Sequence, residues 1–173
     1  MFKTTANKIT MLRIVLIPVF LVLAYGDMMM AALAVYIIAC LSDFADGYIA
    51  RHFNQISNFG KFMDPLADKM LVLAAMCFFV ENGQMAGWAV AIVLFREFAV
   101  SGMRLLAVEQ GQVIAAAWSG KIKTAATMVC LILMMLVNNN VLNIESTVII
   151  VATTVYSGVE YFYVNRAVFK EAD

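Results

Sequence analysis

Four aspartates lie close together in the sequence, as two pairs on either side of a short polar stretch. Asp43 and Asp46 come at the end of one apolar segment, and Asp64 and Asp68 come at the start of the next. Residues three or four apart share one face of a helix, so each pair would present two carboxylates side by side. Carboxylate oxygens suit hard divalent cations such as Mg²⁺ and Mn²⁺. Two such ions can hold the attacking and leaving oxygens of a phosphoryl displacement, so the aspartates predict metal-dependent phosphoryl chemistry.

A second polar cluster is basic and lies later in the chain. Arg96 and Arg104 share one apolar segment, and Lys121 and Lys123 open the next. The arginines are about 80° apart around a helix axis, and the lysines lie near free backbone amides that favour anions. Together the four bases predict a phosphate-binding pocket. The alternative is that Arg104 and the lysines are anchors that extend toward lipid headgroups.

Arg96 lies deep within its segment, where a charged side chain needs a partner. Glu97 is adjacent in the sequence, but we expect it to point to another side of the helix. A substrate phosphate or Glu160 is then the expected partner of Arg96.

The segments that carry both clusters are strongly apolar. Of the 173 residues, 64% are hydrophobic and only 14% are charged, with a mean hydropathy of +0.86. A soluble domain carries about 25% charged residues, so the composition excludes an ordinary soluble protein, a disordered chain and a nucleic-acid binder with a basic face.

The cysteines, Cys40, Cys77 and Cys130, lie in apolar runs, and their odd number argues against a disulfide framework or a zinc site.

Six apolar stretches are long enough to cross a membrane as helices, which takes about 20 residues each. Loop residues separate these stretches, and neither an internal repeat nor a long linker divides the chain. The pattern predicts a single all-α domain over residues 1–173, an integral membrane bundle of six transmembrane helices. The stretches cover residues 9–25, 28–50, 64–80, 86–106, 118–137 and 145–164.

The basic residues indicate the orientation of this bundle. Apart from Arg96, the bases fall toward the two termini or in and beside the second and fourth connections between spans. The opposite connections contain Asp27, Glu81 and Glu145 and no base. Because positive residues mark the cytoplasmic side, we expect both termini and both polar clusters to face the cytoplasm.

The bases before the first span, together with its apolar residues, also resemble a secretory signal. However, no small-x-small cleavage site follows, and a helix kinked at Pro18 fits better.

The aspartates also admit a structural explanation. Asp64 precedes Pro65 and could be a helix N-cap with proline at the first helical position. Asp43 and Asp46 have no such role inside an apolar helix, where a carboxylate costs about 2.5–3.5 kcal/mol on insertion. Gly47 favours a ligand site, since a residue without a side chain lets a ligand approach the backbone.

The full spacing of this region resembles the signature of the CDP-alcohol phosphatidyltransferase family at every position. It reads Asp43-x2-Asp46-Gly47-x2-Ala50-Arg51-x8-Gly60-x3-Asp64-x3-Asp68. The resemblance implies that the four aspartates hold two divalent cations, Mg²⁺ or Mn²⁺. It also implies that Asp68 is the catalytic base that deprotonates the incoming alcohol.

The same resemblance implies a binding site for the CDP-diacylglycerol substrate. The nucleotide would lie against Gly47, Arg51 and Gly60, with Ser57 as a hydroxyl contact, although Gly60 could also be a turn residue. Asn7 and Thr10, together with Arg13, match the opening segment of the family and are assigned to the nucleotide side. That opening segment lacks the proline that is frequent in the family.

Two further segments resemble the phosphatidylglycerophosphate synthase branch of the family, whose acceptor is sn-glycerol 3-phosphate. They read Arg96-Glu97-Phe98-x2-Ser101-Gly102-x-Arg104 and Gly120-Lys121-x-Lys123-Thr124. The resemblance implies that Arg96, Arg104, Lys121 and Lys123 bind the phosphate of this acceptor. Inositol phosphate and serine are the alternative acceptors within the family.

The resemblance also implies a homodimer in the bacterial inner membrane, in contact with membrane lipids and with its active site on the cytoplasmic side. A divalent-cation transporter is the alternative from another functional class, since carboxylates within a membrane also mark ion pathways. Against a transporter, the acids gather at one membrane face, and no polar relay leads to the other side.

Overall fold

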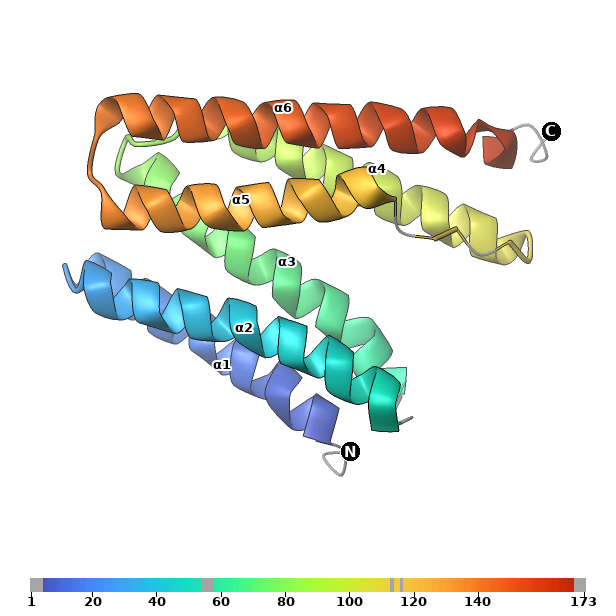
Figure 1. Cartoon of the computed structure of the whole chain (residues 1–173), viewed down its shortest axis with the longest axis horizontal. Coiled ribbons are helices and arrows are strands. Elements are labelled where there is room, and N and C mark those ends of the chain that lie inside the picture. The colour runs from blue at the N-terminus through green and yellow to red at the C-terminus, as the bar shows by residue number, and fades with distance from the viewer. Residues whose placement is uncertain (1–4, 54–57, 113, 116, 170–173) are drawn as a thin grey trace. The chain divides into compact units, whose positions relative to one another are not determined.

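The structure is a computed structural model of the chain (Figure 1). It describes residues 5–53, 58–112, 114–115 and 117–169, with the backbone alone at residues 5–10, 43–53, 58–65, 68, 167 and 169. This part of the chain is all-α. Its helices are α1 (Thr5–Tyr25), α2 (Met29–Phe53), α3 (Asn58–Glu81), α4 (Gly87–Glu109), α5 (Trp118–Leu136), α6 (Asn140–Val164) and a short 3₁₀ helix, η1 (Arg166–Phe169).

The chain divides into two compact units. The first consists of Met1–Asn82 with Met135–Asn138 and holds α1, α2 and α3. The second consists of Gly83–Met134 with Asn139–Asp173 and holds α4, most of α5, α6 and η1. A single domain over residues 1–173 stays a prediction.

In the described part of the chain, the α-helices α1 to α6 agree in number with the six expected spans, but some expected bounds are wrong. α3 begins at Asn58 rather than at residue 64, and α6 begins at Asn140 rather than at residue 145. Asp64 therefore lies inside α3, which overturns its interpretation as an N-cap, and Glu145 lies inside α6 rather than in a connection. Hydropathy finds only the part of a helix that fits the hydrocarbon layer, whereas helices continue into the polar interfacial layer.

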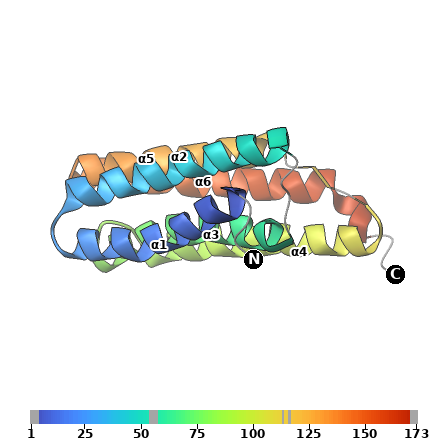
Figure 2. The same ribbon diagram turned by 90° about the horizontal axis from the view of Figure 1, so that it is seen from below.

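In the first unit, α1 packs against α2 and α3, and α2 packs against α3. The rings of Phe20 and Tyr36 lie 5.8 Å apart between α1 and α2, and Tyr25 meets Phe78 edge-on at 5.2 Å between α1 and α3. Figure 2 shows α2 running opposite to α1. Arg13, counted above among the bases of the N-terminus, lies within α1 and is only 1% exposed. This packing makes neighbours of the two helices that carry the aspartates.

In the second unit, α4 packs against α6, and η1 packs against both. Val100 and Met103 of α4 and Tyr161 of α6 form a buried apolar cluster. The Asn139 side chain caps α6 by accepting a hydrogen bond from the Val141 amide at 2.8 Å. α6 runs in the same direction as α4 and opposite to α5 (Figure 1). The C-terminal ends of α4 and α6 therefore lie at the same end of this unit as the start of α5.

Two helices in the described part of the chain, α5 and α6, are long and apolar enough to cross a membrane by length and composition. Shorter apolar helical segments cover Met11–Tyr25 and Met29–Ser42. Many large apolar side chains on these helices are exposed, among them Val22, Trp118 and Val159. Exposed apolar surface of this kind is typical of contact with lipid or with another protein.

Candidate functional site

The aspartates lie where α2 ends and α3 begins. Asp43 and Asp46 are in the last turns of α2, and Asp64 and Asp68 are in the first half of α3. Each pair is spaced to share a helix face, and the two helices pack against each other. The side chains of all four lie outside the described residues. A donor set made only of carboxylates, on two adjacent helices, fits Mg²⁺ or Mn²⁺.

The residues assigned to the nucleotide belong to the same unit. The structure describes their helical backbone but not their side chains, and Ser57 lies entirely outside the described residues. Where side chains are described, no group of three or more His, Cys, Asp or Glu residues could hold a metal ion. The residues on helices are Asn7 and Thr10 on α1, Gly47 and Arg51 on α2, and Gly60 on α3.

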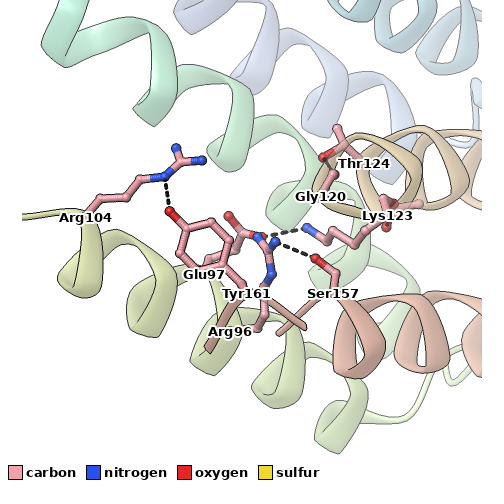
Figure 3. Close-up of polar contacts among 9 residues, drawn as sticks. Arg96, Glu97, Arg104, Gly120, Lys123, Thr124, Ser157 and Tyr161 are labelled. Carbon is pink, nitrogen blue, oxygen red and sulfur yellow. Dashed lines mark hydrogen bonds and ion pairs between the residues drawn. The ribbon is translucent and has the colours of Figure 1, made fainter. Parts of the chain in front are cut away.

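The second unit contains a network of charged side chains between α4, α5 and α6 (Figure 3). Arg96 donates through Nη1 to Glu97 Oε1 at 2.9 Å and through Nη2 to Ser157 Oγ at 2.6 Å. Lys123 donates through Nζ to the same Glu97 oxygen at 2.7 Å. The side chains are largely buried, with exposed fractions of 13% for Arg96 and Glu97 and 7% for Lys123. One carboxylate thus holds two bases from two different helices.

This network corrects the expected partner of Arg96. Glu97 does not point away from Arg96 but forms an ion pair with it. Adjacent helix positions are about 100° apart, but both side chains are long enough to turn toward each other, and Lys123 attracts Glu97 to the same side. Glu160 is not the partner: its Oε2 is buried and has no hydrogen-bond partner within the described residues.

Arg104 lies near this network and contacts the same helix, α6. Its Nε donates to the Tyr161 hydroxyl at 2.9 Å, and its guanidinium lies 5.5 Å from the centre of the Tyr161 ring. Figure 3 shows the terminal nitrogens of Arg104 pointing away from Tyr161. Tyr161 therefore holds the inner part of the guanidinium and leaves its outer edge exposed.

Lys121 is placed differently from the other three bases. It is exposed, and its Nζ lies 4.7 Å from the centre of the Trp118 ring at the start of α5. The structure thus brings Arg96 and Lys123 together around Glu97 and holds Arg104 through Tyr161, but it does not join Lys121 to this group. The assignment of the four bases to a phosphate stays a prediction.

Sequence reasoning did not place three residues of this network in the candidate site: Glu97, Ser157 and Tyr161. Glu97 carried a usable signal, because an acid within an apolar span next to an arginine is rarely without a function. Ser157 and Tyr161 are four apart and share a face of α6. The expected pairing of Arg96 with Glu160 already linked this helix to α4, but no pattern in the sequence indicates that these two hydroxyls contact the arginines.

Residues 3–158 match the CDP-alcohol phosphatidyltransferase family. The chain is 39% identical to the CDP-diacylglycerol–glycerol-3-phosphate 3-phosphatidyltransferase of Bacillus subtilis (strain 168), over 96% of this chain and 97% of that protein. It is 36% identical to a probable phosphatidylglycerophosphate synthase of Mycobacterium tuberculosis (strain H37Rv), over 90% of this chain and 78% of that protein. It is 37% identical to the CDP-diacylglycerol–glycerol-3-phosphate 3-phosphatidyltransferase of Escherichia coli (strain K12), over 71% of each chain.

The family match covers most of the chain, including both polar regions. The chain therefore belongs to the CDP-alcohol phosphatidyltransferase family of membrane enzymes.

Proposed function

We propose that this enzyme transfers the phosphatidyl group of CDP-diacylglycerol to sn-glycerol 3-phosphate, giving phosphatidylglycerophosphate and CMP. The reaction would be a step in the synthesis of anionic phospholipids such as phosphatidylglycerol and cardiolipin. The B. subtilis and E. coli relatives are both named as CDP-diacylglycerol–glycerol-3-phosphate 3-phosphatidyltransferases, which supports this acceptor. The observation that carries the proposal is the network of bases around Glu97.

The charge of this network suits an acceptor that bears a phosphate. Among the described residues, Glu97 is the acid that forms ion pairs with Arg96 and Lys123, and with Arg104 beside them the bases carry a surplus of positive charge. A phosphate monoester carries about −1.5 to −2 at pH 7, so it would neutralise this surplus. Serine carries no phosphate and would leave the bases uncompensated. Inositol phosphate would satisfy them and is the second candidate acceptor.

The four aspartates of α2 and α3 would carry out the chemical step. Asp43, Asp46, Asp64 and Asp68 would hold two divalent cations, Mg²⁺ or Mn²⁺, which when bound neutralise the diphosphate and fix its oxygens. Asp68 would accept the proton of the acceptor hydroxyl as this oxygen attacks the phosphorus of the phosphatidyl group. The bond from that phosphorus to the oxygen of CMP then breaks, and CMP leaves with the electron pair.

The remaining substrate contacts follow the family signature. Gly47 and Gly60 would let the nucleotide approach the helix backbones closely. Arg51, which also belongs to the signature, would pair with its phosphates. Asn7, Thr10 and Ser57 would contribute polar contacts on the nucleotide side. Among the acceptor bases, Lys121 would act from the rim, since it is exposed.

The proposed topology has six membrane spans with both termini in the cytoplasm, in the bacterial inner membrane. The apolar helices and the segregation of the bases support it. Both polar regions would then lie at the cytoplasmic face, where water-soluble acceptors are available. A homodimer is part of the same proposal.

The deciding experiment measures CMP release by the purified protein in lipid nanodiscs with CDP-diacylglycerol and Mg²⁺ or Mn²⁺. sn-Glycerol 3-phosphate, inositol phosphate and serine are compared as acceptors at equal concentration. We expect release that requires sn-glycerol 3-phosphate. CMP release that requires inositol phosphate or serine instead would identify that compound as the acceptor. Flux of Mg²⁺ or Mn²⁺ into liposomes without CMP release would favour a transporter.

A further inference from the structure

Two hydroxyl side chains of α6 face the arginines of α4. Ser157 and Tyr161 are four residues apart, so they lie one helix turn from each other on the same face of α6. They are among the most buried polar residues in the described part of the chain, with exposed fractions of 0% and 1%. Each hydroxyl oxygen accepts a hydrogen bond from one arginine, Ser157 from Arg96 and Tyr161 from Arg104. α6 thus contacts both arginines with a matched pair of acceptors.

The surroundings of Arg96 leave its side chain little freedom. An added Cβ at Gly158 of α6 would lie 3.3 Å from Arg96 Cγ, and one at Gly120 of α5 would lie 3.4 Å from Arg96 Nη2. The two glycines therefore provide the space through which Arg96 passes between α5 and α6. Ser157 and Glu97 then fix the two terminal nitrogens of the guanidinium through one N–H each, and each of these nitrogens carries a second N–H.

The surroundings of Arg104 fix only one side of its guanidinium. Tyr161 accepts from Nε, the nitrogen nearest the helix, and the guanidinium carbon lies 5.5 Å from the centre of the Tyr161 ring. The two terminal nitrogens, on the outer edge, are the ones that form bidentate contacts with phosphate oxygens. An arginine held at Nε and exposed at its outer edge is oriented to receive an anion (Figure 3).

We propose that Ser157 and Tyr161 are positioning residues that orient Arg96 and Arg104 toward the phosphate of the acceptor. The inference rests on the proposed function, because it takes the ligand of these bases to be a phosphate monoester. Neither hydroxyl contacts the reacting atoms. Their loss should weaken phosphate binding and leave the chemical step intact, so KM for the acceptor should rise while kcat changes little.

The first test compares Tyr161→Phe and Ser157→Ala with two matched variants on the same helix. Tyr156→Phe changes an exposed tyrosine, and Ser146→Ala changes a buried serine about three turns earlier. We expect each positioning variant to raise KM for sn-glycerol 3-phosphate about three- to tenfold, the equivalent of one hydrogen bond. KM for CDP-diacylglycerol should not change, and both control variants should match the wild type.

The second test asks whether Tyr161 acts through Arg104. In an Arg104→Gln background, Tyr161→Phe should have no further effect on the acceptor KM, because its target is gone. A purely structural role of Tyr161 would give the same loss in both backgrounds and would overturn the proposal. Should the phenylalanine variant fail to fold, Ser157→Ala with and without Arg96→Lys provides the same comparison at the other arginine.

Inorganic phosphate separates this inference from the proposed function. Protection of the wild type and the variants against thermal unfolding by phosphate gives an affinity that does not depend on the identity of the acceptor. A phosphate affinity several-fold weaker for Tyr161→Phe than for Tyr156→Phe would support the positioning role. This holds even if the enzyme uses another acceptor that bears a phosphate. Equal protection of all variants, or a fall in kcat at constant acceptor KM, would refute it.

Discussion

The two polar regions of the chain differ in how their residues come together. The aspartates occupy one stretch of sequence, residues 43–68, and their spacing alone places them in pairs on two consecutive helices. The bases lie on α4 and α5, and all of them except Lys121 are held by an acid on α4 or by hydroxyls on α6. Local spacing therefore predicts how the aspartates are paired, whereas the arrangement of the bases depends on tertiary packing.

The two regions also differ in the source of the charge that balances their side chains. Four neighbouring carboxylates would repel one another, so the proposed metal site would depend on cations supplied from outside the chain. The bases already have Glu97 as an internal counter-ion, which stabilises them before any ligand binds. Variants of the first region should therefore affect turnover more than folding, and variants of the second should affect folding and acceptor binding.

The largest expected effect comes from removal of divalent cations. Treatment of the enzyme in nanodiscs with EDTA should reduce CMP release to background, because the aspartates cannot hold the diphosphate without cations. Addition of Mg²⁺ or Mn²⁺ in excess of EDTA should restore the rate, whereas Ca²⁺ tests the tolerance for a larger ion. Full activity in EDTA would refute the metal role of the aspartates.

Asp68→Asn should have the next largest effect. It removes the proposed base and one of the metal ligands while it keeps the size of the side chain, and we expect kcat to fall by at least about 100-fold. Asp27→Asn is the matched control, because Asp27 lies in the connection after α1 with a φ of 58°, a conformation that asparagine tolerates. Unfolding temperatures of both variants near that of the wild type would assign the loss to chemistry. Normal turnover by Asp68→Asn would remove Asp68 as the base.

Glu97→Gln tests the second region through stability. The change leaves Arg96 and Lys123 without their shared counter-ion in a largely buried position, a loss of about 3–5 kcal/mol when a buried ion pair is broken on one side. Thermal unfolding in detergent should show a clearly lower midpoint than for the wild type. Glu109→Gln, an exposed acid in the last turn of the same helix, should leave the midpoint unchanged. Equal midpoints for the two variants would mean that Glu97 does not hold the bases.

The sequence predicts the all-α character, the number of helices and the family, because apolar length and a motif of fixed spacing are both local properties. It fails at the start of α3, where the helix already includes residues Asn58 to Lys61, a stretch that hydropathy assigns to a connection. It also fails at Glu97, because the direction of a long side chain depends on the charge that faces it, in this case Lys123 of α5. Ser157 and Tyr161 were not predictable, since no local pattern says which face of α6 meets α4.

Gly158→Ala should have the smallest effect and bears directly on the geometry of the base network. The added methyl group would lie 3.3 Å from Arg96 Cγ, so Arg96 must move by a few tenths of an ångström. A shift of this size should weaken the hydrogen bond to Ser157 without breaking it, and we expect about a twofold rise in the acceptor KM. Gly102→Ala on α4 is the control, since a Cβ there has no heavy atom within 4 Å among the described residues and should leave KM unchanged. Alanine also favours a helix by about 0.5–1 kcal/mol over glycine, so both variants should gain intrinsic helix stability alike. A rise in KM for Gly158→Ala alone therefore reports the position of Arg96, and identical KM values for the two variants would show that the network tolerates the displacement.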